Sequence, residues 1–275
     1  MEPNFQVLPP ERQQPPPPPK SNPQGIFGWI IAGFIAVAKF GFLVLKSLKT
    51  SLSMLLMIWT YSWFFGWWFA AGFVILIFVH EMGHMIAAKW LGLPVSAPLF
   101  IPFVGAAIMM KQNPRDAWTE ALVGYGGPLA GCIGSWICWY AAIQFHAPWL
   151  MGVASASFVI NLFNMIPIPP LDGGRICAAV SPWFWIIGLV LLGIALFYFH
   201  ATSSIFILII VLIVAFPRIK QTLFERATPE MAAYYNTHIS NRISMALMYL
   251  GLIAALLLGY WDASNHLSYL WLNAE

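Results

Sequence analysis

Two histidines and a glutamate lie together in the stretch His80-Glu81-Met82-Gly83-His84. If this stretch is helical, His80 and His84 lie one turn apart on the same face, where their imidazoles can bind a single Zn²⁺. Glu81 lies about 100° further round the helix, so its carboxylate is placed beside the metal and can accept a proton from a water molecule. The motif therefore predicts a catalytic zinc site with one zinc ion per chain.

The residues around this motif are apolar. Lys89 is the next charged residue and marks the expected end of the helix, which places His80 about 13 Å inside that end at the rise of an α-helix. The alternative is a helix end whose polar side chains reach the membrane interface. At this depth a histidine or glutamate does not easily reach water, and ionisable groups inside a membrane are costly unless paired or bound to metal. The depth therefore favours a metal site.

A catalytic zinc ion needs a third protein ligand and one open position. Asp172 is the best candidate, because the stretch from Asn164 to Gly174 interrupts an apolar segment with three prolines and two glycines. Unwound backbone at membrane depth must face protein or a cavity. The alternative is a loop outside the membrane, with Asp172 as a turn residue and Arg175 as its partner. Three glutamates are weaker candidates because they lie in or beside expected loops: Glu120, Glu225 and Glu230.

The composition restricts the class of protein. Of the 275 residues, 60% are apolar and 8% are charged, whereas a soluble domain carries about 25% charged residues. This excludes an ordinary cytosolic enzyme, a nucleic-acid-binding protein and a solvated structural module. The three cysteines lack the CxxC spacing of a thiolate metal site and are expected to be buried and reduced. We expect an all-α polytopic membrane protein with about six to seven transmembrane helices.

The chain divides into five regions by composition. Residues 1–24 hold nine prolines and are expected to form a disordered tail. Residues 25–51 form either an amphipathic helix in the interface or a transmembrane helix, and the sequence leaves both possibilities and the side of the amino terminus open. Residues 52–180 form the expected metal-binding membrane core. The rest divides into transmembrane helices at 181–261, with a cytoplasmic connection at 217–242, and a tail at 262–275.

The apolar run from Leu52 to Leu91 is about twice the length of a membrane-spanning helix, so it must turn, most simply between Ser62 and Trp68. Lysine and arginine concentrate in alternate connections, which places those connections and the metal site toward the cytoplasm. We therefore expect a multi-pass protein of the cell membrane with its active site on the cytoplasmic side. The remaining expected spans are 119–145, 150–171, 183–199, 203–216 and 243–261.

Residues 93–110 do not fit a spanning helix. They contain Pro94, Pro98, Pro102 and Gly105 but remain apolar. Prolines exclude a regular helix, and irregular backbone at membrane depth is tolerated only where it is buried in protein or lines a wet cavity. We therefore expect a re-entrant segment on the cytoplasmic side, with a β-hairpin as one form that it can take.

Three motifs together resemble the site-2 protease family of intramembrane zinc metalloproteases. They are HEMGH in a membrane helix, N-x-x-P-x-x-P-x-D-G at 164–173, and GGPLAG at 126–131. The resemblance covers roughly residues 70–180. It implies a three-helix catalytic core in which zinc is held by His80, His84 and Asp172, with Glu81 as general base. It also implies that Asn164 holds the substrate carbonyl or its oxyanion.

The resemblance further implies that segment 93–110 aligns an unwound substrate strand. This makes four residues candidate substrate contacts: Pro102, Phe103, Val104 and Gly105. Many members of the family carry a PDZ domain between the metal motifs or CBS domains at the carboxyl end, and this chain is expected to be a minimal form without either. The glycines at 126, 127 and 131 fit close helix packing better than a substrate path.

The implied activity is regulated intramembrane proteolysis, with membrane-protein substrates and the lipid bilayer as partners and no nucleic acid. The alternative is a non-proteolytic zinc-containing binding or chaperone protein on the same fold, against which the intact Glu81 argues. An intramembrane zinc protease with a downstream glutamate ligand is disfavoured, because no glutamate occurs deep in a later span. A transporter with a broken helix would need an inverted repeat, and the other half shows no corresponding broken segment.

Overall fold

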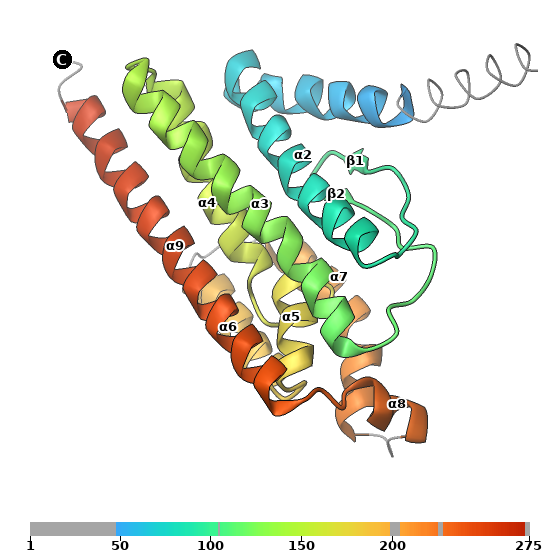
Figure 1. The fold of residues 1–275 in the computed structure, drawn as a ribbon. Helices are drawn as coiled ribbons and strands as arrows, with labels where there is room; N and C mark the ends of the chain where they lie inside the picture. Colours follow the sequence, from blue (N-terminus) through green and yellow to red (C-terminus); the bar gives the residue numbers. More distant parts are fainter. Residues whose placement is uncertain (1–47, 104, 199–203, 225–227, 273–275) are drawn as a thin grey trace, which may run out of the picture. The chain divides into compact units, whose positions relative to one another are not determined.

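The structure is a computed structural model that describes residues 48–103, 105–198, 204–224 and 228–272. The predicted tail at 1–24 and most of segment 25–51 lie outside these residues. The described part is mostly helical (Figure 1). After a helix at 48–65 the elements are α2 (Trp67–Trp90), β1 (Leu99–Ile101), β2 (Gly105–Ala107), α3 (Ala117–Gln144), α4 (Pro148–Asn164), α5 (Asp172–Val180), α6 (Phe184–Tyr198), α7 (Ser204–Ile219), a π-helix at Lys220–Phe224, α8 (Pro229–Tyr234) and α9 (Ile239–Leu272).

The long apolar run at 52–91 is divided at Gly66, within the predicted turn. Gly66 has φ 79° and separates the helix at 48–65 from α2. This left-handed backbone conformation is costly for residues with a Cβ atom but not for glycine. The sequence HEMGH lies within α2, as predicted.

Three helices among the described residues are long and apolar enough to cross a membrane: α2, α3 and the part of α9 up to Ser268. Helices α4, α6 and α7 have 17, 15 and 16 residues, which is shorter than the roughly 20 residues that a span requires. The predicted six to seven spans are therefore not confirmed. Helix α9 also continues to Leu272, through most of the segment predicted as a tail.

Helices α2, α3 and α4 contact one another, and α5 and α9 pack against this group. The largest buried cluster is formed by residues of α3, α4, α5 and α9, with the fully buried Phe158 among them. Helices α2 and α3 approach closely at two glycines, because a Cβ atom on Gly83 would lie 2.1 Å from the carbonyl oxygen of Gly126. This contact supports the packing interpretation of the glycine motif at 126–131.

The segment at 93–110 forms a β-hairpin, which confirms one of the forms expected for it. Strands β1 and β2 are antiparallel, with Phe100 opposite Ala106, and a further bridge joins Val95 to Met110. The helix at 48–65 holds the β1 side, since the backbone N–H of Phe100 donates to the Ser53 hydroxyl at 3.2 Å. Strand β2 lines the cavity that His80 and His84 also line.

Candidate metal centre

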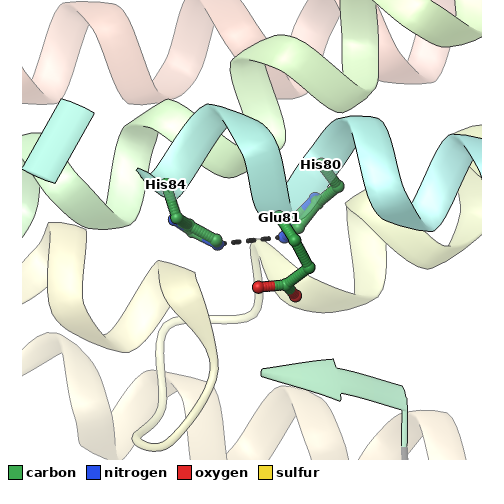
Figure 2. A group of neighbouring side chains, drawn as sticks. All are labelled: His80, Glu81 and His84. Atoms are coloured by element: carbon green, nitrogen blue, oxygen red, sulfur yellow. Dashed lines mark hydrogen bonds between the residues drawn. The ribbon is translucent and has the colours of Figure 1, made fainter. Parts of the chain in front are cut away.

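Three side-chain atoms from α2 and α5 converge at one point. The Nε2 atoms of His80 and His84 lie 3.1 Å apart (Figure 2). The Oδ2 atom of Asp172 lies 3.2 Å from Nε2 of His80 and 3.3 Å from Nε2 of His84. All three residues are buried, with at most 7% of their surface exposed. The two distant sequence motifs therefore meet in a single site.

The hydrogen bonds behind the histidines determine which ring nitrogens face this point. Nδ1 of His84 lies 2.7 Å from the carbonyl oxygen of Val123, which can only accept, so Nδ1 carries the proton. The Asn161 amide donates to the carbonyl of Ser157 at 2.8 Å, so its Oδ1 faces Nδ1 of His80 at 2.8 Å and accepts from it. In the neutral imidazoles both Nε2 atoms therefore present lone pairs to each other and to Asp172.

This donor set fits a zinc ion. Around a tetrahedral Zn²⁺ with bonds of about 2.0–2.1 Å, neighbouring ligand atoms are about 3.3 Å apart. The three observed separations are 3.1, 3.2 and 3.3 Å. A single proton can bridge only two of the three lone pairs, whereas a metal ion bonds all of them. Two imidazoles and one carboxylate also leave one tetrahedral position open, as in catalytic zinc sites.

The turn between α4 and α5 fixes Asp172 at this point. A Cβ atom on Gly173 would lie 2.1 Å from the carbonyl oxygen of Met165, so the start of α5 packs directly on the proline-rich turn. The indole N–H of the fully buried Trp185 donates to the carbonyl of Gly174 at 2.8 Å. Asp172 is 7% exposed, and its Oδ2 atom faces both imidazoles.

Glu81 lies beside the converging atoms. It is 6% exposed, and its nearest ligand atom lies within 4.8 Å of those of His80 and His84. Figure 2 shows its carboxylate to one side of the line that joins the two imidazoles. This is the position that the helical spacing predicts for a proton acceptor.

A cavity of about 420 Å³ opens onto the site and contains several of the predicted substrate contacts. Asn164, the last residue of α4, lines this cavity, as do Phe103 and Gly105 of the hairpin. Pro102 is half-buried in the hairpin turn and is not part of the cavity wall. Val104 lies outside the described residues.

Asn161 is a site residue that the sequence analysis missed. It is 1% exposed and joins His80 to the backbone of α4. Its amide occupies the space over Gly131, since a Cβ atom there would lie 2.2 Å from Oδ1 of Asn161. A Cβ atom on Gly127 would likewise lie 2.2 Å from Nε2 of His84. The available signal was a second asparagine one turn before Asn164 in a mostly apolar helix.

We expect Asn161→Ala to weaken zinc binding about 10- to 100-fold, because His80 would lose the acceptor that fixes its tautomer. The measurement is the zinc dissociation constant of the purified protein by chelator competition. Asn236→Ala is the matched control, since Asn236 is exposed in the loop after α8. Equal zinc affinity in Asn161→Ala and wild type would contradict the role assigned to Asn161.

Two of the weaker glutamate candidates, Glu120 and Glu230, have other surroundings in the structure. Glu120 is buried in the first turn of α3, where Arg218 and Tyr234 bind its carboxylate. Glu230 is exposed at the start of α8, and Glu225 lies outside the described residues.

Fold and site together describe a helical protein with three helices, among the described residues, that are long and apolar enough to cross a membrane, and with a buried His-His-Asp group that could hold a metal ion. Residues 68–147 match the model of the family described as Peptidase family M50. The chain is also 32% identical over 121 residues to a protein named zinc metalloprotease MJ0392 from Methanocaldococcus jannaschii. That alignment covers 41% of this chain and 35% of the relative, so the chain spans about a third of the length of the relative it matches.

Over residues 68–147 the chain is thus similar to peptidase family M50, the site-2 protease family. The matched residues contain His80, Glu81 and His84. Asp172 and the cavity residues of α4, among them Asn161 and Asn164, lie beyond the matched segment.

Proposed function

We propose that this protein is a zinc metalloprotease of the site-2 type, which hydrolyses peptide bonds in or near the transmembrane segments of membrane-protein substrates. The observation that carries the proposal is the convergence of two imidazole Nε2 atoms and one carboxylate oxygen within 3.3 Å of one another. The M50 family match and the relative named as a zinc metalloprotease support the same activity.

One Zn²⁺ held by His80, His84 and Asp172 would supply a Lewis acid that polarises the scissile carbonyl and lowers the pKa of water. The Glu81 carboxylate accepts a proton from the attacking water as the C–O bond forms. It then donates this proton to the nitrogen of the leaving amine as the C–N bond breaks. Asn164 donates a hydrogen bond from its amide to the carbonyl oxygen of the substrate, which stabilises the charge that develops there.

The hairpin supports a role in presenting the substrate. A peptide bond in a helix is sterically covered and its carbonyl is hydrogen-bonded, so a transmembrane substrate must unwind before it is cut. Strand β2 lines the cavity through Gly105, Ala106 and Ala107, while β1 is held by the helix at 48–65. An unwound substrate that pairs along β2 regains backbone hydrogen bonds lost from its helix.

The positive charges on the polar connection support a cytoplasmic position for the site. Three of these charges lie in or beside the connection between α7 and α9: Arg218, Lys220 and Arg242. Such a bias is typical of cytoplasmic connections in multi-pass proteins of the cell membrane. Water would reach the cavity from this side.

The test is hydrolysis by the protein reconstituted in vesicles with a panel of single-span substrates that carry helix-destabilising residues. We expect zinc-dependent fragments cut in or near the span, lost with a chelator and restored by added zinc. The Glu230→Gln variant is the control, because Glu230 is exposed, and it should cleave the substrates as wild type does. Stoichiometric zinc with no cleavage of any substrate in the panel would favour the alternative of a non-proteolytic zinc-containing binding protein.

A further inference from the structure

A buried ion cluster lies beside the metal centre, centred on Glu120 at the start of α3. Arg218 of α7 donates to Oε2 of Glu120 at 2.6 Å, and the Tyr234 hydroxyl of α8 donates to the same oxygen at 2.6 Å. Nε of Arg175 lies 3.6 Å from the other oxygen, Oε1. The Glu120 side chain is only 5% exposed, so three partners surround a charge that is almost removed from water.

The same cluster reaches a predicted zinc ligand through Arg175. Nη1 of Arg175 lies 3.9 Å from Oδ1 of Asp172, the oxygen that does not face the histidines. Oδ2 is left to His80 and His84. The two oxygens of the Asp172 carboxylate thus face different partners, Oδ2 the histidines and Oδ1 the guanidinium of Arg175.

A second contact runs in parallel from Arg218. Its guanidinium lies 5.6 Å from the ring centre of Trp185, within the range of a cation–π interaction. Trp185 in turn donates to the carbonyl of Gly174, two residues after Asp172. The Asp172 side chain is therefore connected through Arg175 and Glu120 to α7 and α8, and the backbone at Gly174 is connected through Trp185 to α7. Both helices belong to the C-terminal third of the chain (Figure 1).

We propose that Arg175 is a positioning residue for Asp172, and that Glu120, held by Arg218 and Tyr234, anchors Arg175. The proposal rests on the proposed zinc site and deepens it, because it gives a role to the polar connection of α7 and α8, which lies outside the segment matched by the family model. A carboxylate whose second oxygen is held in place loses less freedom when it binds a metal ion.

Arg175→Gln is the informative substitution. Glu120 keeps Arg218 and Tyr234 when Arg175 is replaced, so no buried charge is left without a partner. We expect the zinc dissociation constant to rise about 10- to 100-fold. Arg175→Lys keeps the positive charge but loses the planar guanidinium group. Its zinc dissociation constant should therefore lie between those of wild type and Arg175→Gln. Arg115→Gln is the matched control, because the Arg115 side chain is 80% exposed.

Two further readouts separate positioning from a general structural role. The Co²⁺-substituted protein should show altered visible absorption in Arg175→Gln but not in Arg115→Gln, because the bands report ligand geometry. The zinc-free Arg175→Gln protein should unfold at the same temperature as zinc-free wild type. The two substitutions Glu120→Gln and Arg175→Gln can also be combined in one protein. Because Glu120 acts through Arg175, this double variant should bind zinc no more weakly than Arg175→Gln alone.

Wild-type zinc affinity and an unchanged Co²⁺ spectrum in Arg175→Gln would overturn this inference and leave the proposed zinc site intact. Weakened zinc binding together with a lower unfolding temperature of zinc-free Arg175→Gln would also overturn it, because a general loss of stability would then explain the weaker binding. Failure of the wild-type protein to bind zinc would instead overturn the proposed function and this inference together.

Discussion

Replacing Glu81 by glutamine is expected to lower the rate of peptide hydrolysis by about 10²- to 10⁴-fold, the usual contribution of a general acid–base group. Glutamine has nearly the same shape and fits the same buried position, but its amide does not accept a proton from water. Glu81 is not among the three converging atoms, so the variant should still bind zinc as wild type does.

The measurement is the initial rate of cleavage of a single-span substrate together with zinc content, in wild type, Glu81→Gln and Glu230→Gln. Loss of cleavage with full zinc content assigns Glu81 to the chemical step. A Glu81→Gln protein that keeps more than about a tenth of the wild-type rate would remove the general-base role, because even weak acid–base catalysis exceeds that factor.

Replacing His80 by alanine is expected to abolish both zinc binding and hydrolysis. The substitution removes one of the three converging atoms and leaves the Oδ1 atom of Asn161 without its partner. Loss of a direct ligand should weaken zinc binding by more than the roughly 100-fold upper range seen for residues behind the ligands.

The His80 prediction is checked by zinc titration and by the cleavage assay on the same preparation. His238→Ala is the matched control, because His238 is exposed in the connection before α9, where it contacts Ser240. If His80→Ala bound zinc with wild-type affinity, His80 would not be a ligand, and the assignment of the HEMGH motif would be wrong.

The chemical centre could be anticipated from sequence because its residues lie at fixed local spacings. HEMGH on a helix brings two imidazoles to one face whatever the rest of the fold does. Asp172 could be found because prolines and glycines must interrupt a helix at its position. The structure places these residues together, with Asp172 held on a turn where Gly173 packs against backbone.

The residues that support this centre could not be anticipated, because tertiary packing alone gives them their partners. Asn161 faces His80 across 81 positions of sequence, and the contact depends on how α2 and α4 cross. Glu120 reads in sequence as a residue beside a loop, and its burial depends on Arg218 and Tyr234, about 100 residues further along the chain.

The number of spans was the least predictable feature of the fold. Hydropathy identifies apolar runs, but it does not show where a helix begins or ends. The run from Leu52 to Leu91 was correctly divided, because its length exceeds the membrane and glycine permits the turn at Gly66. Helices α6 (Phe184–Tyr198) and α7 (Ser204–Ile219) lie close to the expected segments 183–199 and 203–216, but with 15 and 16 residues they are shorter than the roughly 20 residues of a span.

The central claim is that HEMGH and Asp172 form one zinc site. It is tested most directly by the zinc content per chain of the purified protein, with wild type, Asp172→Ala and Asp262→Ala measured side by side. Asp262 lies in α9 and pairs with His266, so its replacement controls for the loss of a carboxylate. We predict near-stoichiometric zinc in wild type and Asp262→Ala and a sharp fall in Asp172→Ala. Zinc unchanged in Asp172→Ala, or absent from all three proteins after metal has been supplied, would contradict the claim.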